Sequence, residues 1–215
     1  MVTFVMACGA VAGPLFVVAF LAEGVTRADY DALRQPVSAL ALGKWGWTQR
    51  ANFIVTGLLM FAFGVGLWTA LKPYGVAPVV SVLVCLYAVG LIGSGIFVTD
   101  PIGEYRPESK TASLNIHGAL HTGFSMVVFV ALPIACLVLA GGYTAHGSIG
   151  WALISAASGL LFVVGFVFTS MGFSQVQGFS PLGRLAGMAG LLQRLTIFLG
   201  WGWLTLTAMH LLGSV

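Results

Sequence analysis

The sequence contains few charged residues. Of its 215 residues, 7% are charged and 59% are hydrophobic, and the mean hydropathy is +1.01. A soluble domain has about 25% charged residues, so this composition excludes a soluble globular protein. Nine Lys and Arg against six Asp and Glu give a net charge of +3. Because the basic residues are few and scattered, we predict no nucleic-acid partner.

Cysteines and standard catalytic motifs are also scarce. The three cysteines, Cys8, Cys85 and Cys136, lie inside apolar stretches, which predicts small packing residues rather than a disulfide or zinc framework. The chain has no phosphate-binding glycine loop, no nucleophile elbow and no cysteine pair with metal spacing. The sequence therefore indicates no standard enzyme class.

Long apolar stretches are the dominant feature that is present. About 20 apolar residues in a helix cross a bilayer core about 30 Å thick. A transmembrane barrel would need segments of about ten residues that alternate in polarity, and Val79 to Val98 shows no such alternation. The sequence predicts an all-α, polytopic integral membrane protein, a six-helix bundle forming a single membrane domain over residues 1–215, with helices near 3–22, 51–71, 77–98, 116–140, 149–170 and 190–213.

Small residues occur at helical spacing within several of these stretches. Such residues let the backbones of membrane helices approach closely. The sequence therefore predicts tight helix contacts at three pairs: Gly9 and Gly13, Gly90 and Gly93, and Ser155 and Gly159.

The charged residues lie mainly on one side of the predicted bundle. Eight of the nine basic residues fall in the connections after the first, third and fifth helices, and Lys72 alone lies on the other side. Loops rich in Lys and Arg are usually cytoplasmic, so we expect these three loops in the cytoplasm and both termini outside. All six acids lie in the first two of the same loops, which makes this face the candidate functional face.

Three ionisable residues on this face form a candidate catalytic group. Pro101 ends the third helix directly after Asp100, and Ser113 is a plausible N-cap for the fourth, which places His117 and His121 one turn apart on one helix face. We predict that Asp100 and both histidines converge beneath the loop carrying Arg34. Proton transfer, hydrogen bonding between helices, and a divalent metal site at Asp100, His117 and His121 remain open readings.

Further polar residues on the same face are candidates for substrate binding. The segment 23–50 is too polar to span the membrane and long enough for a lid or a lipid-surface segment, and Arg194 is suited to a carboxylate or phosphate headgroup. The predicted substrate-binding residues are Arg34, Ser38, Gln49, Asn52, Tyr105, Ser125, Gln193 and Arg194.

A series of short motifs resembles a known family. They are Ser38-Ala39-Leu40-Ala41-Leu42-Gly43, Gly46-Trp47 with Gln49, Asn52-Phe53 and Gly57, Thr99-Asp100-Pro101, His117-Gly118-Ala119-Leu120-His121 with Phe124-Ser125, and Leu192-Gln193-Arg194. In this order they resemble the prokaryotic membrane proteins of domain of unknown function 998. The chain departs from that pattern at Thr122, where an acid is expected, and at Glu104, where a glycine is expected.

The resemblance implies a small six-helix protein of a prokaryotic inner or plasma membrane and supplies no reaction. Its distant similarity to proteins of lipid handling favours a lipid-facing role. We expect a protein that binds, and in one reading converts, a lipid-like or amphiphilic small molecule, with membrane lipid as its partner. The alternatives are a small transporter or proton-coupled carrier and a non-catalytic accessory subunit. The third and fifth helices contain no Asp, Glu, Lys, Arg or His, which argues against a transporter.

Overall fold

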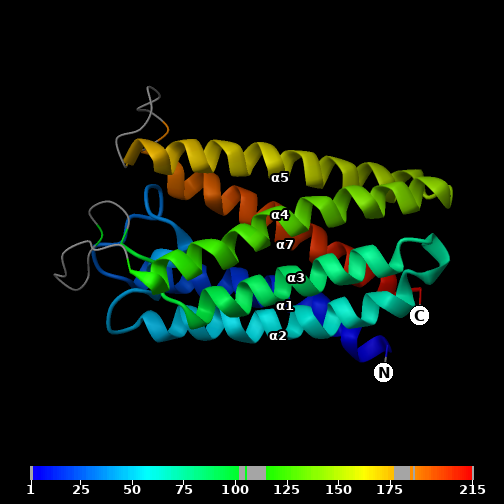
Figure 1. Ribbon diagram of the computed structural model, residues 1–215, viewed down its shortest axis with the longest axis horizontal. Helices are drawn as coiled ribbons and strands as arrows, with labels where there is room; N and C mark the ends of the chain where they lie inside the picture. Colours follow the sequence, from blue (N-terminus) through cyan, green and yellow to red (C-terminus); the bar gives the residue numbers. More distant parts are fainter. Residues whose placement is uncertain (1, 102–104, 106–114, 177–184, 186, 215) are drawn as a thin grey trace.

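The computed structural model describes residues 2–101, 105, 115–176, 185 and 187–214. Within these residues the chain is helical and contains no strand. Six helices are long and apolar enough to cross a membrane, which confirms the predicted all-α membrane fold. They are α1 (Val2–Thr26), α2 (Gly46–Ala70), α3 (Ala77–Ile96), α4 (Ile116–Ala145), α5 (Ile149–Val176) and α7 (Ala189–Leu212), joined in part by the short 3-10 helices η1 (Val37–Ala41) and η2 (Lys72–Tyr74) (Figure 1).

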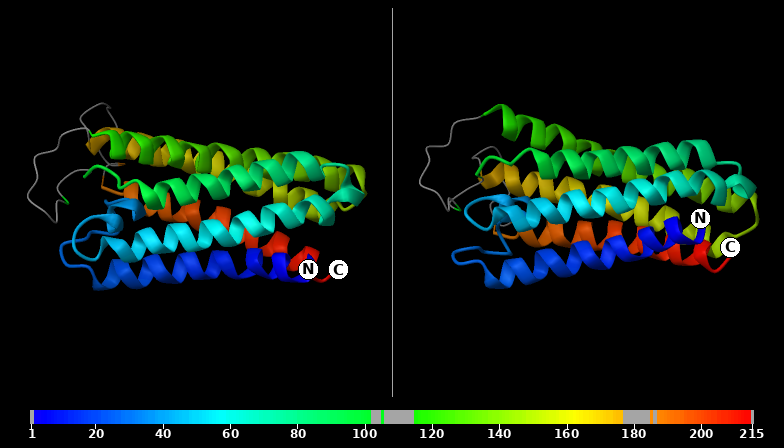
Figure 2. Two further views of the ribbon diagram at one scale, coloured as in Figure 1. Left: turned by 60° about the horizontal axis from the view of Figure 1, so that its bottom comes forward. Right: turned by 90° about the horizontal axis from the view of Figure 1, so that it is seen from below.

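These helices form a closed ring. Each helix packs mainly against its neighbour in sequence, and α7 packs against α1 to complete the circle. Both ends of the chain lie at one end of the bundle, and the loop of residues 27–45 lies at the other (Figures 1 and 2). The ring therefore has an interior, and its charged end is the one that carries this loop.

The polar segment after α1 is shorter than the sequence suggests. The helix α1 continues to Thr26 and α2 begins at Gly46, so the connection is residues 27–45, the first loop, rather than 23–50. Glu23 and Arg27 form an ion pair of 3.1 Å across one helical turn, an interaction that supports helix. This explains why charged residues extend α1 beyond its apolar stretch.

The predicted small-residue contacts are confirmed. A Cβ atom added at Gly9 would meet the ring of Phe63 in α2, one at Gly90 or Gly93 would meet α4, and one at Gly159 would meet Cys136 in α4. Ser155 accepts a hydrogen bond of 3.0 Å from the indole of Trp203. Close approach at these positions holds the ring together.

A substitution at Gly13 tests this packing. A Cβ atom there would collide with Thr205 and lie 3.2 Å from the carbonyl oxygen of Trp201, both in α7. Gly13→Leu should therefore separate α1 from α7 and cost about 1–3 kcal/mol, as overpacking does. Thermal unfolding in detergent measures the effect. The control is Gly141→Leu, because no atom lies within 4 Å of a Cβ added at Gly141; equal melting temperatures for the two variants would contradict close packing at Gly13.

Candidate functional site

The first loop is fastened to the start of α7. The amide of Leu191 donates a hydrogen bond of 3.0 Å to the carbonyl of Leu33, and the amide of Val37 donates one of 2.8 Å to Oε1 of Gln193. A Cβ atom at Gly190 would collide with the backbone carbonyls of Ala32 and Gln35. Only glycine permits this close approach, so the first loop packs in a fixed position against the start of α7.

Arg194 is the centre of this attachment. Its side chain is 5% exposed, and its Nη1 donates to the carbonyls of Ala32 at 2.6 Å, Gln35 at 2.9 Å and Gly190 at 3.0 Å. Its Nη2 donates to the hydroxyl of Tyr30. Among the described residues no carboxylate pairs with Arg194. Its donors are used by oxygens of the protein itself, whereas the sequence predicts Arg194 as a ligand for a headgroup.

Two tyrosines pack beneath this attachment. The rings of Tyr30 and Tyr105 meet edge to face with centroids 5.4 Å apart. Burial raises the pKa of Tyr30 to about 12, although the neighbouring Arg194 acts in the opposite direction. Burial also raises the pKa of Tyr105, against the opposing effect of Arg27. Both hydroxyls are therefore protonated at neutral pH.

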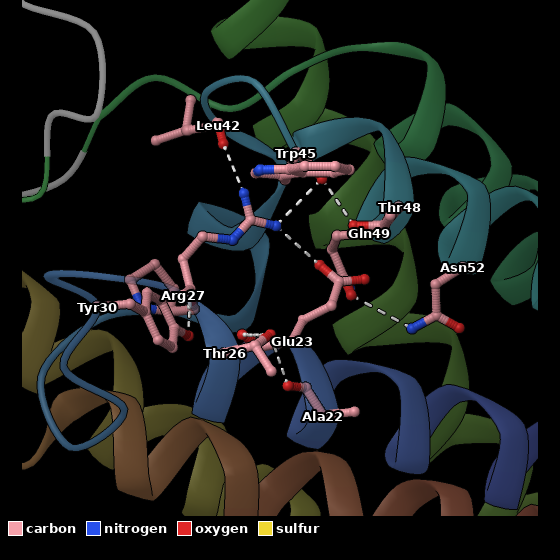
Figure 3. A network of polar contacts seen from close by, with 11 residues as sticks. Ala22, Glu23, Thr26, Arg27, Tyr30, Leu42, Trp45, Thr48, Gln49 and Asn52 are labelled. Carbon is pink, nitrogen blue, oxygen red and sulfur yellow. Dashed lines mark hydrogen bonds and ion pairs between the residues drawn. The ribbon is translucent and has the colours of Figure 1, made fainter.

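Arg27 fastens the other end of the first loop (Figure 3). Its guanidinium donates to the carbonyls of Leu42 at 3.4 Å and Trp45 at 3.1 Å, and to the carboxylate of Glu23 at 3.1 Å. The side chains of Arg27 and Glu23 are 11% and 14% exposed. A largely buried ion pair thus ties the end of α1 to the residues that precede α2.

Gln49 and Asn52 form a buried amide pair beside this ion pair (Figure 3). Asn52 Nδ2 donates to the carbonyl of Phe16 at 3.1 Å and to Oε1 of Gln49 at 3.3 Å. Among the described residues, Gln49 Nε2 and Asn52 Oδ1 have no partner. Buried polar atoms of this kind normally bind ordered water. Both predicted substrate-binding residues therefore lie inside the contact between α1 and α2.

Asp100 and His117 lie at the start of α4. The residue that caps this helix is Asn115, which accepts a hydrogen bond of 3.1 Å from the amide of Gly118; the predicted cap, Ser113, lies outside the described residues. Asn115 Nδ2 donates to Asp100 Oδ1 at 2.6 Å. His117 is exposed, with its ring 5.9 Å from that of Phe97. Asp100 is thus held by the N-terminus of α4.

His121, one turn further along α4, is 3% exposed. Its Nδ1 lies 3.0 Å from the carbonyl oxygen of Ser94 and 2.9 Å from that of Phe97, at the end of α3. The last carbonyls of a helix have no partner within it. Because carbonyls only accept, Nδ1 must carry the hydrogen. The imidazole is therefore fixed in one tautomer, and no described residue is hydrogen-bonded to its Nε2.

His121 lines a cavity of about 200 Å³ inside the ring. All six helices and η1 contribute to its walls, which are mainly aromatic and aliphatic side chains. None of the lining residues is Asp, Glu, Lys or Arg. The polar groups at its loop end belong to His121, Gln193 and the hydroxyl residues Ser38, Ser94, Thr99, Thr122, Ser125, Thr169 and Ser170.

Several of the residues that line the cavity are exposed on α4 and α5. Phe129 of α4 stacks on Phe166 of α5 with centroids 4.8 Å apart. Beyond this contact, towards the first loop, the lining residues Thr122 and Ser170 are exposed and Met126 is 43% exposed. The outer faces of both helices also carry exposed apolar residues, such as Val130 in α4 and Val163 in α5. The cavity thus has exposed lining residues on two adjacent apolar helices.

The structure separates the predicted site residues into groups. His121, Ser38, Ser125 and Gln193 line the cavity, whereas Asp100 and His117 are not among its lining residues. Arg34 and Tyr105 line a pocket of about 980 Å³ at the outer end of the bundle, where Arg34 pairs with Asp31 at 3.5 Å. Sequence reasoning missed Ser94 and Thr169, because a hydroxyl in an apolar helix carries no signal of a cavity.

The described residues contain no cluster of three His, Cys, Asp or Glu side chains that could hold a metal ion. Glu104, which follows Asp100 in the same connection, lies outside the described part of the chain. The cavity lining includes one histidine and no carboxylate, and the nearby carboxylate of Asp100 is held by Asn115 outside this lining.

The family comparison agrees with the motif pattern. The model of the family described as "Protein of unknown function (DUF998)" matches residues 10–210. The chain belongs to this family. The match covers all six helices almost completely, including the cavity and the first loop. No match was found among curated proteins or solved structures.

Proposed function

We propose that this multi-pass membrane protein binds a lipid-like or amphiphilic molecule, whose polar end enters the cavity from the bilayer between α4 and α5. The observation that carries this proposal is a cavity with apolar walls and a polar end, whose lining residues Thr122, Met126 and Ser170 are exposed on α4 and α5. We also propose that the protein lies in a prokaryotic cell membrane with the first loop in the cytoplasm, supported by the charge bias of its loops.

The volume of the cavity supports a ligand that is only partly enclosed. Pockets for drug-sized molecules are about 300–1,000 Å³, and this cavity is about 200 Å³. A whole amphiphile does not fit, whereas its polar end and the first part of one chain do. The rest of the chain would remain in the opening beside Met126, in contact with surrounding lipid.

Polar groups must supply most of the selectivity. A chain that leaves the bilayer is already in an apolar solvent, so its transfer into an apolar cavity gains little free energy. By contrast, a buried hydroxyl or imidazole without a partner costs about 1–3 kcal/mol. Thr169 is 3% exposed and its Oγ1 has no partner among the described residues. A ligand that satisfies such groups would be preferred over bulk lipid.

Closing the opening tests the proposal. Met126→Trp should fill the passage between α4 and α5 and reduce the amount of co-purified amphiphile several-fold, as measured by native mass spectrometry of the protein released from nanodiscs. The control is Val130→Trp, one turn further along α4, where the side chain is 48% exposed and does not line the cavity. Equal retention in the two variants, or no retained molecule in the unaltered protein, would contradict the proposal.

A further inference from the structure

We propose that the bound molecule presents a neutral hydrogen-bond donor, a hydroxyl or an amide N–H, to Nε2 of His121. This inference rests on the proposed function, because it specifies the chemistry of the ligand in the same cavity. It selects long-chain alcohols, acylglycerols and fatty amides over fatty acids and phospholipids.

The first argument is the fixed tautomer of His121. Nδ1 donates to the carbonyls of Ser94 and Phe97, so the neutral ring has its lone pair at Nε2. That atom belongs to a ring that lines the cavity, and no described residue is bonded to it. His121 is 3% exposed, and burial disfavours the charged form of an imidazole, so the ring is neutral and its Nε2 can only accept. The complementary group on a ligand is therefore a donor.

The second argument is the absence of charge. The residues lining the cavity include no Lys or Arg that could neutralise an anion and no acid that could neutralise a cation. Burying an ion without a partner costs far more than burying a hydrogen-bonded neutral group. Arg194, the buried cation that holds the first loop, does not line the cavity and already donates to three carbonyls and one hydroxyl. The cavity is thus suited to an uncharged head.

The third argument concerns the hydroxyls around the same space. Ser94 and Ser125 lie 3.1 Å apart, joined by a hydrogen bond between their oxygens, while Thr169 has no partner among the described residues. A ligand hydroxyl both donates and accepts. It can donate to His121 and at the same time accept from a hydroxyl of the cavity wall. An ester oxygen can only accept from the wall hydroxyl and leaves His121 without a partner.

Three probes with the same chain separate these possibilities. Lauryl alcohol is a neutral donor, methyl laurate is neutral without a donor, and lauric acid at pH 8 supplies an anion. Each is added to the protein in nanodiscs, and the retained amount is measured by mass spectrometry. We expect the alcohol to be retained roughly fivefold or more above the ester, about the value of one additional hydrogen bond, and the acid to be retained least.

Two variants assign the effect to the proposed groups. His121→Leu should abolish the preference for alcohol over ester while leaving ester retention unchanged. Thr169→Val is the second variant: it removes a hydroxyl without a described partner, should preserve the fold, and should lower the retention of alcohol and ester alike, because both oxygens can accept from Thr169. Because His121 also ties α3 to α4, a measurement on the unaltered protein accompanies the variants. The ¹⁵N signal of His121 Nε2 in the unaltered protein should shift on addition of the alcohol and not of the ester.

The outcomes are distinct. Equal retention of alcohol and ester, preference for the acid, a preference that survives His121→Leu, or a ¹⁵N signal of His121 Nε2 that the alcohol does not shift would overturn this inference while leaving an amphiphile-binding cavity in place. Failure to retain any of the three probes, with Met126→Trp behaving like the unaltered protein, would contradict the proposed function and the inference with it.

Discussion

Replacing Arg194 with methionine is expected to release the first loop from the bundle. The carbonyls of Ala32 and Gln35 and the hydroxyl of Tyr30 would lose a buried donor at once. Each unsatisfied buried acceptor costs about 1–3 kcal/mol, so the variant should lose about 3 kcal/mol or more of stability. Thermal unfolding in detergent and limited proteolysis of residues 27–45 measure this loss.

Arg34→Met is the matched control for this experiment. Arg34 lies in the same loop, but its pair with Asp31 is exposed, with side chains 67% and 44% accessible. Exposed pairs contribute about 0–1 kcal/mol, so the melting temperature should change little. If Arg194→Met were as stable and as resistant to protease as Arg34→Met, the attachment described for the loop would be incorrect. Arg194→Lys should lie between the two, because one ammonium cannot reproduce the planar fork.

The ion pair at the other end of the loop should respond to a second variant, Arg27→Met. This change leaves the largely buried carboxylate of Glu23 without its cation and frees the carbonyls of Leu42 and Trp45. Removing one partner of a buried pair typically costs about 3–5 kcal/mol. Thermal unfolding of the purified protein should show a correspondingly large decrease in melting temperature.

A double variant isolates the free-energy cost of leaving the Glu23 carboxylate without its cation. Glu23→Gln combined with Arg27→Met removes both charges, so the double variant should be more stable than Arg27→Met alone. Glu23→Gln alone serves as the control, because it leaves the bonds from Arg27 to the two carbonyls in place. A double variant less stable than Arg27→Met would show that the cost comes from the loop carbonyls and not from the carboxylate.

Much of the architecture is predictable because a lipid environment restricts which residues a membrane helix can contain. A helix in lipid must be apolar over about 20 residues, so the six spans are visible as apolar stretches, and Gly9, Gly90 and Gly159 mark contacts because close backbones require small residues. The predicted ends differ more, since α1 continues through Glu23 to Thr26. Charged residues end an apolar stretch without ending a helix.

The site is less visible because its bonds involve backbone atoms of distant segments. The residue types do not indicate that the backbone carbonyls of Ala32 and Gln35 will accept hydrogen bonds from Arg194. Similarly, His117 and His121 share a helix face by spacing, yet His117 is exposed and His121 is buried against the end of α3. Helical periodicity gives the direction of a side chain, and only the packed neighbours decide what that side chain meets.

The closure of the ring by α7 also has a consequence for how the protein is made. Arg194 reaches carbonyls 162 and 159 residues earlier in the chain, so residues 27–45 emerge from the ribosome long before their anchor exists. Synthesis proceeds from the N-terminus at about 5–20 residues per second, which leaves this segment unanchored for roughly ten to thirty seconds. Insertion of α7 therefore completes the attachment of a loop translated much earlier, and the cavity acquires its full wall only when α7 has joined the ring.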